Sequence, residues 1–545
     1  PPSQLYRLRK LVRRHRLQFA AAGMIFATVL VGAIVATAFA VEATAQKNEA
    51  ESSLARWTRL ADRRRLEPLS EEAAGLWPAT PERLPALRDW LARAQVLAAR
   101  LDGHRAALRQ LRAQAIDDPP ATQAADRAFY WAEHLRLEEI AHAIQLVDAE
   151  GRAALQRERE TLEATVAKRH TWLFASNDLA FRHGQLQELV ADLELFATAE
   201  RSELLATVPD VTQRRAQAEQ LRADAQRPES VAAWDALRAD VARPDSPYRG
   251  LDVVAAPIPG LVPLGVDRDS GLWELYHTRS GAAPTWDGEP LGRGRVVLSA
   301  TSDEGIVLVL LPGGSFRMGA EAAGPERGAD QPNVDAGAVS WERPVHEVTL
   351  DPFLIGKYEV TRGQWERLFG PPSYNDAHEI FWRTTPRHPI ADVTWRACDE
   401  AARRWDLILP TEAQWEYACR AGTTTAWFTG NASRTLRRFA NVGDTNAARP
   451  VGELRPNAFG LHDVHGNVAE WCRDELVTYE LPTRAGDGFR GAWTDPPRRK
   501  GALRGGFAGV PLQFSRSATR GEHDAASPTT AVGVRVARPL RHRSR

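Results

Sequence analysis

The sequence predicts an α+β protein in three parts: an N-terminal transmembrane helix, an all-α helical stalk and a loop-rich C-terminal domain. Three observations indicate this organisation. Residues 19–41 are apolar and uncharged, residues 42–245 are rich in Ala, Leu, Arg and Glu, and the remainder has frequent Pro, Gly and Trp among short β-like runs. At 545 residues the chain is too long for one compact core, because domains usually hold roughly 100 to 200 residues.

The apolar segment 19–41 is long enough to cross a bilayer, since a helix rises about 1.5 Å per residue and the hydrocarbon core is about 30 Å thick. Six cations precede this segment, and the first charge after it is Glu42. This cation excess predicts that residues 1–18 are a cytoplasmic juxtamembrane segment and that the chain after Val41 is extracytoplasmic. The lipid bilayer is therefore an expected partner. A cleaved signal peptide is the alternative, although its apolar run is usually only about 7 to 15 residues.

Residues 42–245 are predicted to form the helical stalk, because their composition favours helix at nearly every position. Apolar residues recur at alternating spacings of four and three, which places each set on one stripe of a helix. One such stripe contains Leu186, Leu189, Leu193 and Phe196. Pro119, Pro120 and Pro228 interrupt the pattern and predict several helices instead of one rod. Packing within the chain and a coiled coil between chains both stay open, so a homo-oligomer through the stalk is a candidate assembly.

The composition of the sequence changes after Asp245. Prolines, glycines and short β-like runs predict a β-rich linker over residues 246–304, and a loop-rich α+β domain follows. Within that domain, Pro410 and Thr411 precede Glu412 and Gln414, a pattern typical of a helix start capped by Thr411.

Charge and cysteine content exclude two classes of protein. The chain has 70 Lys and Arg against 70 Asp and Glu, without the basic excess expected of a protein that binds nucleic acid along its length. Its three cysteines, Cys398, Cys419 and Cys472, are too few for a disulfide scaffold and form no C-x-x-C pair.

Six motifs in the C-terminal part occur in a specific order: LPGGSFRMGA (311–320), RPVHEVTLDPFLIGKYEVTRGQW (343–365), ILPTEAQWEYACRAG (408–422), NAFGLHDVHGNVAEWCRD (457–474), LRGG (503–506) and VGVRVAR (532–538). Together they closely resemble the formylglycine-generating enzyme, or sulfatase-modifying factor, family over residues 305–538. The resemblance implies a variant of the C-type-lectin-like fold and bound calcium. The basic segment and single span also resemble bacterial transmembrane serine/threonine kinases, which implies a cytoplasmic kinase upstream of residue 1.

The loop from Asp463 to Glu470 has the composition of a calcium site, because calcium takes six to eight hard oxygen ligands. In the family the matching loop binds calcium through an Asx side chain, two backbone carbonyls and a Glu. Carried over to this chain, these ligands are Asp463, Gly466, Val468 and Glu470. A second family site begins at a pair that resembles Asn441 and Val442, but its downstream half has no match here.

The family's oxidase chemistry uses two cysteines soon after the Arg-Gly-Gly motif to hold copper(I), which prefers soft thiolate ligands. Here Val510 stands at the first of these positions, and no cysteine follows Cys472. The sequence therefore argues against copper. Cys419 matches a structural cysteine of the family whose partner position is Ser517. We assign no catalytic residue and interpret His346, His462 and His465 as structural or loop residues.

The leading hypothesis is an extracytoplasmic recognition domain for an unknown protein, peptide or small ligand, coupled by the stalk to a cytoplasmic partner. Ligand contact is expected in residues 507–531, where loops rise from a rigid base. The candidate contact residues are Trp493, Phe507, Phe514, Arg516 and Arg520, although Phe507 and Phe514 could equally pack in the core. The alternatives are an enzyme that retains oxidase or transferase activity through unidentified residues, and a structural spacer in the cell envelope.

Overall fold

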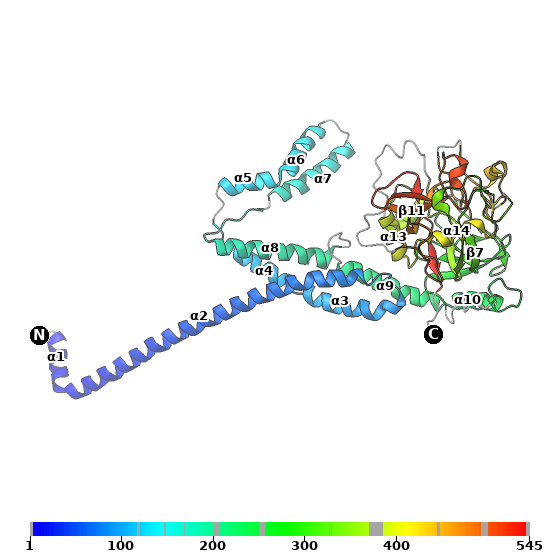
Figure 1. The fold of residues 1–545 in the computed structure, drawn as a ribbon. Coiled ribbons are helices and arrows are strands. Elements are labelled where there is room, and N and C mark those ends of the chain that lie inside the picture. Colours follow the sequence, from blue (N-terminus) through cyan, green and yellow to red (C-terminus); the bar gives the residue numbers. More distant parts are fainter. Residues whose placement is uncertain are drawn as a thin grey trace. The chain divides into compact units, whose positions relative to one another are not determined.

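The computed structural model describes residues 4–116, 120–145, 149–167, 169–199, 207–249, 257–325, 328, 330–369, 385–443, 447–491 and 500–540 (Figure 1). The chain divides into two compact units. The N-terminal unit contains Pro1–Ala74 and Asp89–Val211, and the C-terminal unit contains Gly75–Arg88 and Thr212–Arg545. The described strands all belong to the C-terminal unit, so the mixed helix and strand content agrees with the predicted α+β class.

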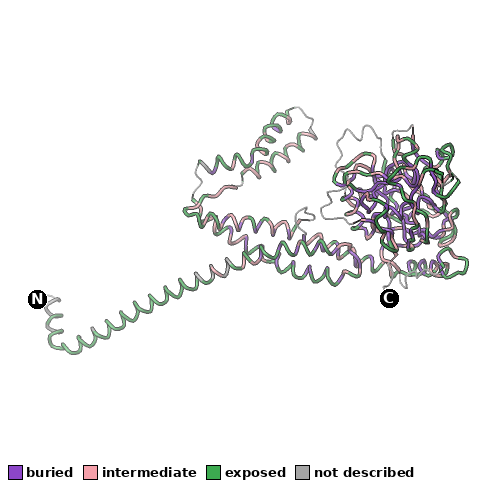
Figure 2. Tube along the Cα trace, viewed as in Figure 1, coloured by how far each residue is buried: buried purple, intermediate pink, exposed green. Residues whose placement is uncertain are grey.

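The N-terminal unit begins with helix α1 (Gln4–Arg14), which is followed after His15 by the 59-residue helix α2 (Arg16–Ala74). Within the described residues, Arg16–Lys47 of α2 is the one helical stretch long and apolar enough to cross a membrane. It includes the predicted span 19–41, and the green colour of this part of α2 in Figure 2 marks it as exposed. The helix does not end at the predicted edge of the span but continues past Glu42.

Helices also fill the described part of the predicted stalk, as its composition indicates. They are α3 (Leu84–Ala98), α4 (Leu101–Arg112), α5 (Pro120–Phe129), α6 (Trp131–Ala143), α7 (Ala149–Val166), α8 (Asn177–Thr198), α9 (Val208–Ala225) and α10 (Pro228–Val241), with a short 3₁₀ turn at Pro81–Arg83. The predicted stripe on α8 is fully buried. Polar contacts also join α4 to α8, because Arg105 pairs with Glu194 at 2.8 Å and Arg112 Nε lies 3.1 Å from His183 Nε2.

The larger sheet of the C-terminal unit has six strands in the order β14-β9-β6-β2-β1-β4. Its strands are β1 (Leu261–Asp267), β2 (Trp273–His277), β4 (Arg293–Gly294), β6 (Val307–Leu311), β9 (Phe353–Gly356) and β14 (Ala537–Pro539). The neighbours are antiparallel except for β1 and β4. Strands β1, β2 and β4 come from the segment 246–304 that the sequence predicts as a β-rich linker. That segment extends the sheet beyond β6, which is buried along its whole length.

A second sheet has the order β12-β11-β10-β13 and carries much of the candidate site. Its strands are β10 (Ala469–Glu475), β11 (Lys500–Arg504), β12 (Gly521–Asp524) and β13 (Val532–Gly533). Two smaller pairs are β3 (Thr285–Trp286) with β5 (Val296–Val297), and β7 (Gly314–Met318) with β8 (His346–Leu350). The remaining described elements are helices α11 (Arg362–Phe369), α13 (Trp395–Arg404) and α14 (Glu412–Arg420) and 3₁₀ turns at Ser340–Glu342, Ser433–Arg438 and Leu512–Ser515.

Helix α14 begins as the sequence predicts. The Thr411 hydroxyl accepts a hydrogen bond from the Gln414 amide at 3.1 Å, and the Gln414 side chain accepts one from the Thr411 amide at 3.0 Å. This reciprocal cap satisfies two backbone donors that the helix itself leaves free. The whole helix is buried, so the cap fixes charged residues of α14 inside the domain.

Helix α10 packs against the larger sheet within the C-terminal unit. Trp234 on α10 donates a hydrogen bond to the Leu261 carbonyl at 3.2 Å, and Trp273 on β2 donates one to Asp240 at 2.8 Å. The Tyr248 hydroxyl, just after α10, donates to the Leu310 carbonyl at 2.9 Å. The aromatic bodies are buried in the same core as the sheet, so the last helix of the predicted stalk is firmly attached to the C-terminal domain.

Candidate functional site

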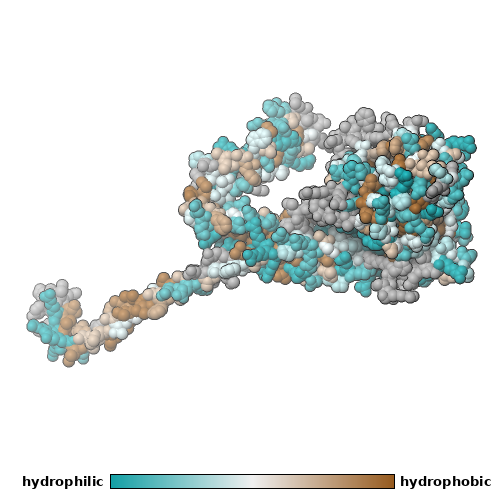
Figure 3. Space-filling model, in the orientation of Figure 1, coloured by the Kyte–Doolittle hydropathy of each residue, from teal (hydrophilic) through white to brown (hydrophobic). Residues whose placement is uncertain are grey.

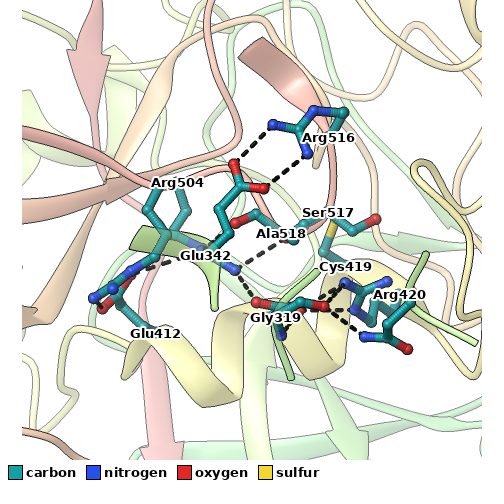
Figure 4. A network of polar contacts seen from close by, with 12 residues as sticks. Gly319, Glu342, Glu412, Cys419, Arg420, Arg504, Arg516, Ser517 and Ala518 are labelled. Carbon is teal, nitrogen blue, oxygen red and sulfur yellow. Dashed lines mark hydrogen bonds and ion pairs between the residues drawn. The ribbon is translucent and has the colours of Figure 1, made fainter. Parts of the chain in front are cut away.

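The centre of the C-terminal domain contains a buried network of arginines and carboxylates (Figure 4). Arg504, at the end of β11, is fully buried and pairs with Glu416 on α14, while its guanidinium also donates to the Ser517 and Ala518 carbonyls at 3.0 and 3.2 Å. Glu416 also pairs with Arg420 at 2.8 Å. Although burial raises the pKa of Glu416, Arg420 and Arg504 together lower it below its usual value. Glu416 is therefore held as a carboxylate.

Arg516 and Arg520, both predicted as ligand contacts, belong to this network. Arg516 donates to Glu342 at 2.7 Å and to Asp335 at 2.7 Å. Arg520 pairs with Glu412 and donates to the Trp341 carbonyl at 3.0 Å. Both arginine side chains are buried, and protein acceptors engage their guanidinium groups. They join the segment 335–342 to the segment 512–520 instead of presenting charge to solvent.

The aromatic candidates are placed differently. Phe507 and Phe514 are 36% and 51% exposed, so the core-packing alternative does not describe them. Trp493 lies outside the described residues. Trp341 is not among the predicted contacts, but its side chain is also exposed. It lies in a segment that Arg516 and Arg520 hold against the loop of Phe514. A tryptophan beside Ser340, Glu342 and Arg343 is the sequence signal that could have identified it.

The predicted calcium loop leads into β10 and is strongly curled. Asp463, Gly466 and Asn467 all have positive φ angles, and the loop is buried throughout. A Cβ at Gly466 would lie 2.3 Å from the Asn441 carbonyl oxygen, so only glycine allows this close approach. Asp463 accepts a hydrogen bond from the Gly452 amide at 2.8 Å. Asn441, the candidate start of a second site, donates to the Asn467 side chain at 3.1 Å and so supports the same loop.

Glu470 lies on β10, where protein donors engage its carboxylate. Arg535 pairs with it at 2.7 Å, and Trp415 Nε1 donates to its Oε2 at 2.7 Å. Glu359, which the sequence reasoning missed, accepts hydrogen bonds from Asn467 at 2.6 Å and from the Val468 amide at 3.1 Å. Three buried carboxylates, those of Glu359, Asp463 and Glu470, therefore lie near the Arg535 guanidinium, and Glu470 pairs with it directly.

This cluster has two more negative charges than positive ones when all its groups are ionised. Burial raises the pKa of Asp463 to about 6, and burial together with Asp463 and Glu470 raises the pKa of Glu359 well above its usual value. Either protons or a divalent cation could balance the charge, since buried charges need partners. Among the described residues, no three His, Cys, Asp or Glu side chains are arranged around one metal position. A bound ion would therefore need backbone carbonyls, as the predicted set with Gly466 and Val468 includes. The excess negative charge would suit a calcium ion at this loop, whereas the Glu470 carboxylate is already engaged by Arg535 and Trp415.

The three cysteines, His462 and His465 are held inside the protein by burial or hydrogen bonds. All three cysteines are free and buried. Burial raises the pKa of the Cys419 thiol to about 12, although the adjacent Ser517 hydroxyl lowers it, so this thiol is protonated near neutral pH. The structure thus brings Cys419 beside Ser517, the position that the resemblance assigns to its partner. Burial also lowers the pKa of His462 and that of His465 to about 3, which makes both rings neutral.

Comparisons with known proteins find one matching family model and several similar proteins. A model of the sulfatase-modifying factor enzyme 1-like domain matches residues 297–540. The formylglycine-generating enzyme of Streptomyces coelicolor is 30% identical over 224 residues, which cover 30% of this chain and 68% of that protein. The serine/threonine-protein kinase pkn1 of Chlamydia pneumoniae is 29% identical over 187 residues, which cover 31% of this chain and 27% of the kinase. The structure of PvdO from Pseudomonas aeruginosa is 28% identical and covers 43% of this chain and 95% of that chain, with a TM-score of 0.36. Through the domain at residues 297–540, the chain belongs to the sulfatase-modifying factor enzyme 1-like family.

Proposed function

We propose that this chain is a membrane-anchored recognition protein whose sulfatase-modifying factor domain binds a ligand outside the membrane without copper-dependent oxidation. The observation that carries the proposal is the placement of the thiols. The chain has three cysteines, all buried, and Val510 stands where the family places the first copper ligand. Burial raises the pKa of Cys398 and that of Cys472 well above the usual value, so neither thiol supplies the thiolate that copper(I) requires.

The exposed aromatic residues support recognition as the remaining role. Phe514 and Trp341 lie on segments that buried arginine pairs hold in place, which keeps the conformational entropy cost of binding low. Aromatic side chains on such a base are typical of ligand-contact surfaces. Phe507, Phe514 and Trp341 would supply apolar contact area, while Arg516 and Arg520 would position the segments that carry them.

The N-terminal half supports a membrane anchor for this domain. Helix α2 includes the apolar stretch, and the cations before it would retain the N-terminal end in the cytoplasm. We infer that the stalk couples the ligand state to a cytoplasmic partner, for which a serine/threonine kinase is the candidate. Similarity to the Chlamydia pneumoniae kinase supports a kinase as this partner, and the match covers 27% of that kinase.

A calcium ion held by Asp463, Glu470 and the carbonyls of Gly466 and Val468 is part of the proposal. It would balance the excess negative charge of the buried cluster and stiffen the loop before β10, which is a structural role. The rest of the loop is already held by Glu359 and Asn441, whose side chains hydrogen-bond to it.

A second candidate function is an oxidoreductase of the formylglycine-generating type, which the similarity to the Streptomyces coelicolor enzyme favours. Metal analysis of the purified full chain separates the two. After exposure to calcium, copper(I) and iron(II) and removal of unbound ions, the recognition proposal expects stoichiometric calcium and neither copper nor iron. Retention of one copper or iron per chain would support the enzyme instead.

A further inference from the structure

Helix α2 has two opposite apolar faces beyond the membrane stretch, and its own bundle covers only one of them. The covered face contains Leu66, Leu69 and Ala73, all of which are buried. The other face contains Trp57 and Leu60, which are 70% and 52% exposed. Trp57 and Leu66 are nine residues apart, which at 3.6 residues per turn puts them about half a turn from each other. Trp57 and Leu60 therefore point away from the intramolecular bundle.

The exposed face is part of a longer repeat. Counting back from Leu60 in alternating steps of three and four, the described residues between the membrane stretch and the bundle are small, apolar or short polar ones: Ala43, Gln46, Ala50, Ser53, Trp57 and Leu60. This spacing defines one seam of a left-handed coiled coil. None of the six carries a charge, whereas charged residues occur elsewhere on this part of the helix.

The same repeat continues without a phase change through the apolar stretch. Its positions there are Ala22, Ile25, Val29, Gly32, Ala36 and Phe39. Small residues at such positions let two helices approach closely in lipid, where packing drives association. Figure 3 shows the hydrophobic surface of this rod-like part of α2. The seam from Ala22 to Leu60 thus crosses the membrane boundary on one uninterrupted helix.

We propose that the seam Ala22–Leu60 of α2 is the interface of a parallel homodimer, and that its occupant is the α2 helix of a second copy of this chain. Two copies of one chain insert into the membrane with the same topology, so their α2 helices run parallel. A second copy therefore meets the geometric requirement of a parallel coiled coil. Charge complementarity supports the register. In a parallel pair, position 42 of one helix faces position 47 of the other, and these residues are Glu42 and Lys47, of opposite charge. The proposal rests on the membrane anchor of the proposed function but not on ligand recognition.

A matched pair of cysteine variants tests the seam. Ala43→Cys lies on it, and Ala45→Cys lies on the opposite side of the same helical turn, at the same depth and with the same original residue. The full chain in carbonate-washed cell membranes is treated with a mild thiol oxidant and separated on a non-reducing gel. The unaltered chain is the blank, since its three cysteines are buried. We expect a cross-linked dimer from Ala43→Cys at about fivefold or more the yield from Ala45→Cys, because only seam positions meet in a coiled coil.

A second arm tests the exposed residues themselves. Adding Trp57→Glu and Leu60→Glu to Ala43→Cys should reduce the dimer yield to that of Ala45→Cys, while circular dichroism shows unchanged helix content. Equal yields from Ala43→Cys and Ala45→Cys, or no effect of the two glutamates, would overturn the dimer seam and leave the ligand proposal standing. Loss of the chain from washed membranes would instead contradict the anchor on which the seam rests.

Discussion

Two buried charged clusters in the C-terminal domain differ in charge balance, and this difference separates structural from ion-dependent parts of the site. The first cluster contains four arginines, Arg420, Arg504, Arg516 and Arg520, and four carboxylates, Asp335, Glu342, Glu412 and Glu416. The second contains the carboxylates Glu359, Asp463 and Glu470 and the guanidinium of Arg535. A balanced cluster supplies its own counter-charges, whereas an unbalanced one must take up protons or a cation.

Disrupting the balanced cluster should have the largest effect. Arg504→Met should lower the free energy of unfolding by about 3 to 5 kcal/mol, because it leaves buried carboxylates without a partner. The matched control is Lys500→Met on the same strand, where the Lys500–Glu522 pair is exposed and worth at most about 1 kcal/mol. Denaturant unfolding of both variants measures the difference. Similar losses in the two variants would show that the network does not hold the domain together.

The unbalanced cluster should make stability depend on pH when no calcium is present. The pKa of Asp463 is raised to about 6 in the folded protein, above its usual value, so the folded state binds more protons than the unfolded state between about pH 4 and 6. Stability should therefore fall by about 3 kcal/mol as pH rises through this window, and Asp463→Asn should remove that component. Unfolding curves in chelator at several pH values measure it. An identical pH dependence in Asp463→Asn would contradict the assignment.

Calcium should counteract the same charge excess. At a calcium concentration about 100-fold above its dissociation constant, binding to the folded state alone would add about 2.7 kcal/mol. A chelator should lower the melting temperature of the full chain near neutral pH, and Asp463→Ala should remove this sensitivity. The melting curve of the unaltered protein with and without chelator measures the stabilisation by calcium. Superimposable curves would mean that protons alone balance the cluster.

The smallest effect on stability is expected at the exposed surface. Phe514→Ala should change the free energy of unfolding by no more than about 0.5 kcal/mol, because half of the side chain is already in solvent. Phe353→Ala, in the buried strand β9, is the contrasting variant and should cost about 3 to 5 kcal/mol. Thermal unfolding of both measures this. A large loss in Phe514→Ala would assign that residue to packing and remove it from the ligand surface.

The sequence predicts those features that local pattern determines. The apolar stretch of α2, the stripe on α8 and the Thr411 cap follow from composition, spacing and one local motif, and each is present in the structure. The roles of Arg516 and Arg520 could not be predicted in this way, because their partners Glu342 and Glu412 are more than one hundred residues away in the chain. For the cluster around Arg535, the sequence contains one signal of a buried ion pair, namely a charged residue within an apolar run.

That signal is present at Arg535, which stands between Val534 and Val536. It is weaker at Glu359, because Lys357 and Tyr358 separate this residue from the apolar strand β9. A lone charge in such a run indicates a buried ion pair, since an unpaired buried charge is too costly. The segment 246–304 was harder to place, because its strands pair with β6, and strand order in a sheet depends on contacts that the sequence pattern does not contain.

An assay for formylglycine tests most directly whether this protein is a recognition protein or an oxidase. The purified full chain is incubated with copper(I), oxygen and a cysteine-containing sulfatase peptide, with the Streptomyces coelicolor enzyme as the positive control. We expect no peptide aldehyde by mass spectrometry, because the three thiols are buried and the Cys419 thiol is protonated. Aldehyde that forms with the unaltered chain and disappears in Cys419→Ser or Cys472→Ser would contradict the recognition function and identify the protein as an oxidase.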